Sequence, residues 1–204
     1  MAMRGVYISI DGIDGAGSTT HTKILADWLK SKGLKVLATK EPTLGKIGLL
    51  IREYLSKPSL HPAIDALLFA ADRVEHSMII SKALNEGVLV ISDRSIISSL
   101  AYQKAQGLEE EWILEINKYA LKPDIPIILD IDPAQSLSRK NTPREKFEEL
   151  NFLKAVRENL LTMALKNNWK IVDTSRPIDE VASDIRSYVA FKLREHGVNL
   201  NEKL

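Results

Sequence analysis

A glycine-rich segment near the start of the chain has the residue types and spacing for phosphate binding. The segment GIDGAGST, residues 12–19, follows a short β-rich stretch and opens a helical pattern. Glycines let the backbone wrap a phosphate with several N–H groups pointing inward, and the helix N-terminus adds a favourable dipole. The alternative is a glycine-rich turn that binds no nucleotide. The residues expected to bind the phosphates of ATP are Gly12, Asp14, Gly15, Ala16, Gly17, Ser18, Thr19 and Thr20.

Ser18 stands where phosphate-binding loops of the pattern G-x-x-x-x-G-K-[ST] carry a lysine. That lysine lies against the β- and γ-phosphates, and removing one such donor typically costs on the order of 10²–10³ in rate. Lys23, five residues beyond Ser18, points around the helix away from the loop. We therefore expect a cation elsewhere to replace the lysine. The candidates are Arg94, Arg139, Lys140, Arg144 and Lys146.

The chain that positions these residues alternates short apolar runs with helical patterns. Such alternation is typical of βαβ units, in which helices cover both faces of a parallel sheet. We predict one α/β domain over residues 1–204, with the P-loop NTPase fold, a five-stranded parallel sheet and a short lid at about 139–149. Ligands of this architecture bind at the carboxyl ends of the strands. The expected strands are 6–10, 35–39, 88–91, 125–131 and 170–173, and the expected helices lie near 19–32, 47–55, 62–86, 150–164 and 178–189.

The composition limits the partners that the protein could have. Lys and Arg number 28 against 27 Asp and Glu, so the net charge is +1. This balance gives no electrostatic reason to expect a nucleic acid polymer or a membrane surface as partner. The sequence has no cysteine, which excludes disulfides and cysteine-based metal or redox chemistry. No apolar run approaches the roughly 20 residues that span a bilayer. We expect a cytoplasmic protein.

Four ordered blocks of the sequence match one family of enzymes. They are DGIDGAG at 11–17, EPT at 41–43 with the later IR at 51–52, LFAADRVEH at 68–76 and DRSIISSLAYQ at 93–103. With these blocks the chain resembles the thymidylate kinases, which are P-loop nucleoside-monophosphate kinases, along nearly its whole length. It departs from their pattern at Ser18 and at Ser95, which replaces an aromatic residue. The resemblance implies phosphoryl transfer from ATP to dTMP, with Mg²⁺ as cofactor, by a homodimer.

The resemblance also implies which residues hold dTMP. Phe69 offers a flat face for stacking a pyrimidine, and Arg73 lies four residues on, hence on the same helix face. Arg73 and Gln103 would contact the base. A core aromatic, a surface ion pair of the arginine with Asp72 or Glu75, and a solvated Arg52 are the alternatives. The expected dTMP-binding residues are Asp14, Arg52, Phe69, Arg73, Arg94, Ser99 and Gln103.

Asp93 and Arg94 follow an apolar strand, where a carboxylate linked to magnesium belongs. Arg94 would bridge the acceptor phosphate and the transferring group and stabilise the charge of the transition state. In the lid, the resemblance places Arg139 beside adenine and makes Arg144 the favoured catalytic donor, with Lys146 second. The alternative for Arg94 is a helix-capping salt bridge, and solvated surface is the alternative for each charged residue of the lid. The expected catalytic residues are Asp93, Arg94 and Arg144, and the expected metal ligands are Asp14, Thr19 and Asp93.

Two other functions stay open at the level of sequence. The first is a broader kinase of dTMP and dUMP, because the 5-methyl group of thymine contributes only a modest apolar term. The second is a nucleotide-binding homologue with impaired catalysis, because Ser18 replaces the lysine. A signalling GTPase is disfavoured, since no N-K-x-D segment for reading guanine occurs.

Overall fold

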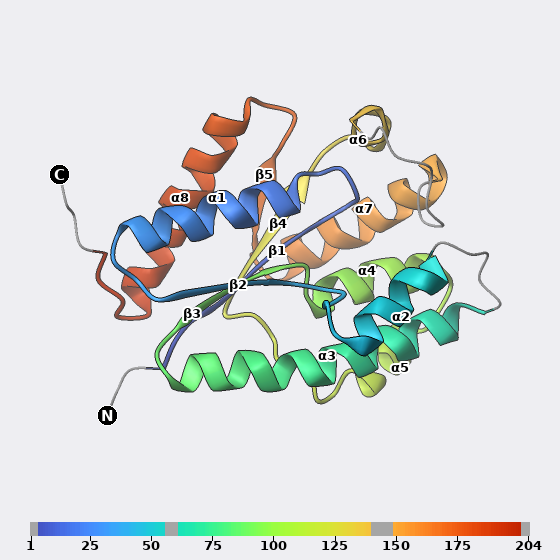
Figure 1. Cartoon of the computed structure of the whole chain (residues 1–204). Coiled ribbons are helices and arrows are strands. Elements are labelled where there is room, and N and C mark those ends of the chain that lie inside the picture. Colours follow the sequence, from blue (N-terminus) through green and yellow to red (C-terminus); the bar gives the residue numbers. More distant parts are fainter. Residues whose placement is uncertain (1–3, 56–60, 140–148, 201–204) are drawn as a thin grey trace.

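A parallel sheet between two layers of helices forms the molecule (Figure 1). The computed structural model describes residues 4–55, 61–139 and 149–200. Their five strands lie in the order β2-β3-β1-β4-β5, and every neighbouring pair is parallel. The predicted α/β fold with a five-stranded parallel sheet is therefore confirmed. The strands are β1 (Tyr7–Gly12), β2 (Val36–Lys40), β3 (Leu89–Asp93), β4 (Ile125–Asp130) and β5 (Lys170–Asp173).

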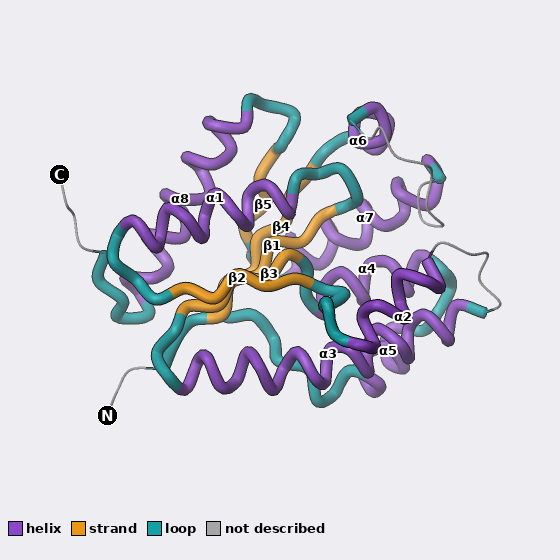
Figure 2. Tube along the Cα trace, viewed as in Figure 1, coloured by secondary structure: helices purple, strands orange, loops and turns teal. Residues whose placement is uncertain are grey.

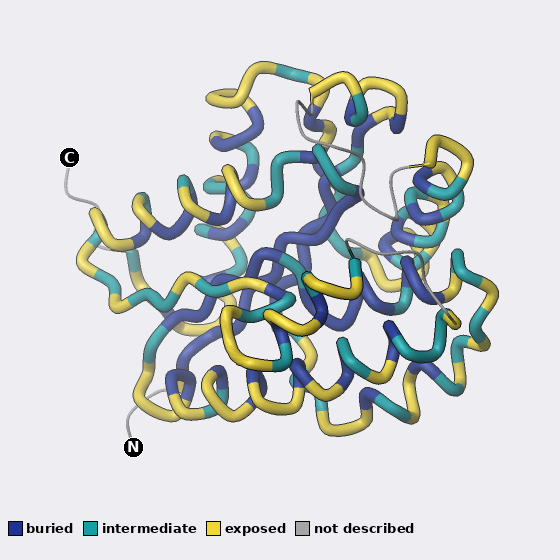
Figure 3. The backbone as a smooth tube through the Cα atoms, turned by 45° about the vertical axis from the view of Figure 1, so that its right-hand side comes forward, coloured by how far each residue is buried: buried dark blue, intermediate teal, exposed yellow. Residues whose placement is uncertain are grey.

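The three central strands are the most deeply buried part of the chain. Every residue of β1 and β3 is buried, whereas the edge strands β2 and β5 are partly exposed. Figure 3 shows the strands in dark blue inside helices whose outer faces are exposed. A strand covered by helices on both faces must be apolar along its whole length rather than at alternate residues. Burial on both faces of the sheet therefore explains the continuous apolar runs of the sequence.

Two groups of helices cover the two faces of the sheet (Figures 1 and 2). The helices α1 (Ser18–Ser31) and α8 (Ile178–Glu195) pack on one face, and α3 (Pro62–Asn85), α4 (Ile96–Ala105) and α7 (Leu150–Lys166) pack on the other. The remaining helices are α2 (Lys46–Leu55), α5 (Glu110–Ile116) and α6 (Pro133–Ser138). No helix of the described residues combines the length and apolar character needed to cross a membrane.

The order of the strands places one crevice at the carboxyl end of β1. From β1 the chain moves to β2 and β3 on one side and later to β4 and β5 on the other. Where strand order reverses in this way, the connections diverge and leave room for a ligand. The loop after β1, the end of β3 and the end of β2 all lie at this edge, because neighbouring strands are in register there, with Ile10 opposite Asp93 and Lys40 opposite Asp93.

Candidate active site

The loop between β1 and α1 has a backbone that only glycine adopts without strain. Gly15 and Gly17 have φ angles of 81° and 93°, in the left-handed region. A Cβ atom at Gly15 would lie 2.6 Å from the carbonyl oxygen of Ser136. Helix α1 begins at Ser18, so its first N–H groups, which have no partner within the helix, face the space beside the loop. This geometry suits an anionic group.

A cavity of about 610 Å³ lies against this loop. Every residue predicted to bind the phosphates of ATP lines this cavity except Gly12. The carbonyl oxygen of Gly12 accepts a 3.1 Å hydrogen bond from Arg94 Nη1. Arg139 also lines the cavity and donates to the carbonyl oxygen of Thr174 at 2.9 Å. Arg144, Lys140 and Lys146 lie outside the described residues, so their roles in the lid stay predictions. The loop residues lining the cavity are Asp14, Gly15, Ala16, Gly17, Ser18, Thr19 and Thr20.

Thr19 and Asp93 form a pair that fits a magnesium ion. The hydroxyl of Thr19 donates to Asp93 Oδ2, while Asp93 Oδ1 is buried and has no hydrogen-bond partner among the described residues. Mg²⁺ binds oxygen atoms and, with nucleotides, takes one or two protein carboxylates together with phosphates and waters. The described residues contain no group of three or more His, Cys, Asp or Glu able to hold a metal.

Arg94 is surrounded by hydrogen-bond acceptors at the end of β3. Its guanidinium forms an ion pair with Asp14 Oδ1. It also donates to Ser98 Oγ at 3.2 Å and to the hydroxyl of Tyr102 at 3.3 Å, and lies 5.0 Å from the centre of the Tyr102 ring. Asp14, a predicted metal ligand, is thus bound to Arg94 rather than to the pair of Thr19 and Asp93. These contacts fix the direction in which the guanidinium points.

The surroundings of Arg94 also keep it charged. Burial by itself would lower its pKa, but Tyr102, Asp14 and Asp93 raise that pKa above its ordinary value. Arg94 and Asp14 line both the phosphate cavity and a second cavity between α3 and α4. A permanent cation at the junction of two cavities can contact groups bound in both.

The second cavity has a volume of about 140 Å³ and suits a pyrimidine base. Phe69 provides an aromatic face, and Gln103 is buried with its Oε1 atom unpartnered among the described residues. An unpaired amide oxygen in a cavity can accept a hydrogen bond from a base N–H. The structure thus brings together six of the residues predicted to bind dTMP, which are Asp14, Phe69, Arg73, Arg94, Ser99 and Gln103.

Arg73 is held in this cavity by a buried network. Its Nε donates to Glu41 Oε2 at 2.8 Å, its Nη2 donates to Ser99 Oγ at 2.8 Å, and its Nη1 donates to Asn117 Oδ1. Glu41 Oε1 in turn lies 3.0 Å from His76 Nδ1. Burial by itself would raise the pKa of Glu41, but Arg73 and His76 lower it below its ordinary value. Arg73 is therefore a buried, oriented cation rather than a partner of a surface carboxylate.

Arg52 is the one predicted dTMP-binding residue that does not line this cavity. Its Nη1 donates to the carbonyl oxygens of Thr43 and, at 2.9 Å, Gly48, and its Nη2 donates to that of Pro42. These bonds stabilise the turn that leads into α2. A contact of Arg52 with the acceptor phosphate stays a prediction.

Ser95, which stands where the family pattern has an aromatic residue, is built into the packing. It caps the N-terminus of α4, and its hydroxyl donates to Asp11 Oδ2 at 2.9 Å. Ser98 Oγ donates to the other oxygen of Asp11 at 2.7 Å. Asp11 is fully buried, and burial raises its pKa above the ordinary value although these hydrogen bonds lower it. The serine thus ties the start of α4 to the strand that leads into the phosphate loop.

Several residues of the site had no role in the predictions from sequence. Glu41 lies in the block at 41–43 and Tyr102 in the block at 93–103. Because Tyr102 is four residues after Ser98, the sequence could have placed both on the same helix face. His76 lies in the same block as Phe69 and Arg73, and the structure places its ring against Glu41. Asn117 follows no motif, and only the three-dimensional structure places it against Arg73.

Comparisons with known proteins agree with this geometry. The model of the family described as Thymidylate kinase matches residues 10–185. A probable thymidylate kinase of Pyrococcus horikoshii is 42% identical over 202 residues, covering 94% of this chain and 98% of that protein. One from Pyrobaculum aerophilum is 43% identical over 187 residues, covering 90% and 95%, and one from Staphylothermus marinus is 44% identical over 191 residues, covering 91% and 94%. The chain belongs to the thymidylate kinase family.

Proposed function

We propose that this protein transfers the γ-phosphoryl group of ATP to dTMP and releases dTDP and ADP. The observation that carries the proposal is the place of Arg94 and Asp14, which line both the cavity beside the glycine-rich loop and the cavity beside Phe69 and Gln103. The resemblance to relatives named as thymidylate kinases supports the same reaction. A protein that only bound nucleotide would need no residue directed at two substrates.

In this reaction an oxygen of the dTMP phosphate attacks the γ-phosphorus of ATP. The bond from that phosphorus to the β,γ-bridging oxygen breaks, and its electron pair stays on ADP. Arg94 lies between the two cavities and neutralises charge on the transferring group, while the loop N–H groups bind the donor phosphates. Thr19 and Asp93 would hold Mg²⁺, which neutralises phosphate charge when bound. Since positioning and charge do most of the work, no covalent intermediate is required.

Base selection would come from Phe69, Arg73 and Gln103. The Phe69 ring stacks on the base, and the amide of Gln103 pairs with its polar edge. The network around Arg73 holds its guanidinium in place before the base arrives, so little rotamer entropy is lost on binding.

The direct test is turnover of ATP with dTMP, dUMP, dCMP and AMP, measured as ADP release in a coupled assay. We expect turnover with dTMP, and Gln103→Leu to raise KM for dTMP at least tenfold with a smaller change in KM for ATP. Equal kcat/KM for dUMP and dTMP would instead establish the broader pyrimidine kinase. No ADP release with any pyrimidine monophosphate would reject the kinase and leave a nucleotide-binding homologue.

We further propose that two copies pair through α3. Leu67, Ala71, Val74 and Met78 are exposed on this helix at spacings of four, three and four residues. That spacing forms a continuous apolar seam, as on helices that pack lengthwise against another helix. An exposed apolar seam on one helix is self-complementary when a two-fold axis brings two copies together.

Equilibrium sedimentation tests the dimer. Met78→Glu should shift the protein toward monomer, because it places a charge inside the seam. Leu165→Glu is the matched control, since Leu165 on α7 is 75% exposed and Met78 is 72% exposed. A wild-type protein that is monomeric at micromolar concentration, or equal effects of the two substitutions, would rule out this interface.

A further inference from the structure

A lysine outside the phosphate loop lies beside the position at which the loop lacks one. Lys40 is the last residue of β2 and pairs in register with Asp93, the last residue of β3. Neighbouring strands are about 4.8 Å apart, and register partners in a parallel sheet present their side chains on the same face. Asp93 accepts a hydrogen bond from Thr19 of α1, so this is the α1 face. Lys40 therefore stands next to the Thr19–Asp93 pair.

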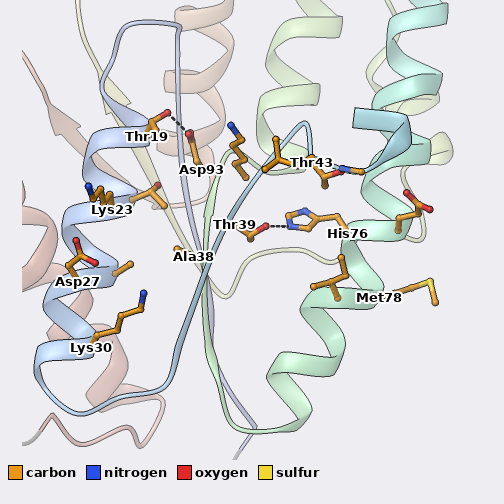
Figure 4. A pocket seen from close by; sticks show the side chains of 17 residues that line it. Thr19, Lys23, Asp27, Lys30, Ala38, Thr39, Thr43, His76, Met78 and Asp93 are labelled. Atoms are coloured by element: carbon orange, nitrogen blue, oxygen red, sulfur yellow. Dashed lines mark hydrogen bonds between the residues drawn. The ribbon is translucent and has the colours of Figure 1, made fainter. Parts of the chain in front are cut away.

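The other residues at the end of β2 agree with this orientation. Side chains alternate between the two faces of a strand. Thr39 points to the opposite face, where its Oγ1 lies 2.7 Å from Nε2 of His76 on α3. Figure 4 shows this contact on one side of the strand and the contact between Thr19 and Asp93 on the other. The neighbours of Thr39 along the strand, Ala38 and Lys40, must then face α1.

Lys40 lines a cavity of about 850 Å³ whose other lining residues come mainly from α1, α3 and the turn after β2. Figure 4 shows the side chains that line this cavity. Thr19 and Asp93 line both cavities, so the two spaces meet at the pair suited to magnesium. This junction is where the γ-phosphate of a nucleotide bound in the loop would end. An ammonium on the long, flexible stem of a lysine can enter it from the β2 side.

The ammonium of Lys40 is also available. Lys40 is exposed, and its ammonium has no hydrogen bond or ion pair with any described residue. The arginines that line the phosphate cavity are already engaged. Arg94 pairs with Asp14, Arg139 donates to a backbone carbonyl, and Arg176 forms a 2.6 Å ion pair with Asp184.

We propose that Lys40 contacts the γ-phosphoryl oxygens of ATP and performs the task of the lysine that is absent at position 18. This inference rests on the proposed phosphoryl transfer. The ammonium keeps its proton throughout; it holds the γ-phosphoryl group while the bond to the bridging oxygen breaks and the bond to the acceptor oxygen forms. Ser18 is then tolerated because the charge arrives from the neighbouring strand rather than from the loop.

The test compares Lys40→Met with Lys30→Met, a substitution of another exposed lysine that lines the same cavity eleven residues beyond Thr19 along α1. We expect Lys40→Met to lower kcat on the order of 10²-fold with KM for dTMP unchanged. Lys40→Arg should retain most of the activity, and Lys30→Met should stay within twofold of wild type. By titration calorimetry, Lys40→Met should weaken ATP binding and leave ADP binding unchanged, because only ATP carries the γ-phosphate.

A rescue experiment makes the inference specific. Adding Ser18→Lys to Lys40→Met should raise kcat at least tenfold above that of Lys40→Met alone. The inference is overturned if Lys40→Met turns over within threefold of wild type, if Lys30→Met loses as much, or if Ser18→Lys restores nothing. A wild-type protein that forms no ADP from ATP and dTMP would instead overturn the proposed function, so the two failures are distinguishable.

Discussion

The two substrate cavities of this protein are built by different means. The pyrimidine cavity between α3 and α4 is shaped by buried side chains that hold one another, with Arg73 fixed by Glu41, Asn117 and Ser99. The phosphate cavity is shaped by backbone, through glycines in left-handed conformations and the start of α1. A site made of side chains depends on each member of its network. A site made of backbone N–H groups keeps its shape when one side chain, such as the lysine missing at Ser18, is lost.

The largest expected effect comes from the residue that the two cavities share. Arg94→Ala removes a preorganised cation from the transferring group, so kcat should fall by about 10³-fold or more. Steady-state kinetics with saturating ATP and dTMP measure this loss. Arg94→Lys is the control, because it keeps the positive charge and loses the planar pair of donors. Its kcat should lie between those of the wild type and Arg94→Ala. Activity of Arg94→Ala within tenfold of wild type would show that the Arg94 guanidinium does not stabilise the transferring group.

The second substitution tests the side-chain network of the pyrimidine cavity. Arg73→Met leaves the carboxylate of Glu41 buried without its main partner, which should lower the free energy of unfolding by about 3–5 kcal/mol. Urea denaturation measures the change. Adding Glu41→Gln to Arg73→Met should recover part of the stability, because the unpaired charge is then removed. Additive losses in the double variant would mean that the two residues do not act as a pair.

The third substitution tests the backbone of the phosphate cavity. Gly15→Ala places a Cβ atom in a left-handed conformation and against the carbonyl oxygen of Ser136, so we expect KM for ATP to rise while KM for dTMP stays constant. Gly33→Ala is a matched control: Gly33 also has φ near 81°, but no atom lies within 4 Å of its added Cβ. Both should lose about 1–2 kcal/mol of stability from the conformation, and only Gly15→Ala should alter ATP binding. Equal KM values for ATP in the two variants would contradict a tightly fitted loop.

The smallest expected effect is on the pH dependence of stability. The pKa of Glu41 is lowered in the folded protein, so its contribution is fully present above the ordinary value of about 4.3 and is lost as pH falls through the folded value. The pKa of Asp11, beside the phosphate loop, is raised, so its ionisation costs stability as pH rises from the ordinary value toward the folded one. Glu41→Gln should therefore flatten acid unfolding below about pH 4, and Asp11→Asn should steepen it. Thermal melts between pH 3 and pH 7 measure both slopes, and unchanged slopes would mean that neither pKa is shifted.

The sheet was predictable from sequence because its strands are buried on both faces and therefore form continuous apolar runs. Helix α4 was not predicted, since the successive residues Ile97, Ser98 and Ser99 are all buried, on different sides of the helix, and no amphipathic period remains. The helices α5 and α6, of seven and six residues, are too short to show a period.

The parts of the site that lie within contiguous blocks were also predictable, and Phe69, Arg73 and Gln103 do line one cavity. The hydrogen bonds that orient these residues were not predictable. Asn117 belongs to no motif, and only the folding of the chain brings it within hydrogen-bond distance of Arg73. The direction of Arg52, which turns to backbone carbonyls, likewise depends on the turn before α2 rather than on its position in a motif.

The backbone conformation of Arg94 lowers the stability of the protein, whereas its side chain serves catalysis. Its φ of 75° lies in the left-handed region, where a residue with a Cβ atom is disfavoured by roughly 1–2 kcal/mol. Glycine at this position would relieve that strain and lose the guanidinium, so selection for stability and selection for turnover act on position 94 in opposite directions. In a homologue that has lost kinase activity, we expect glycine to replace arginine at position 94. The residue at this position would then distinguish active from inactive homologues.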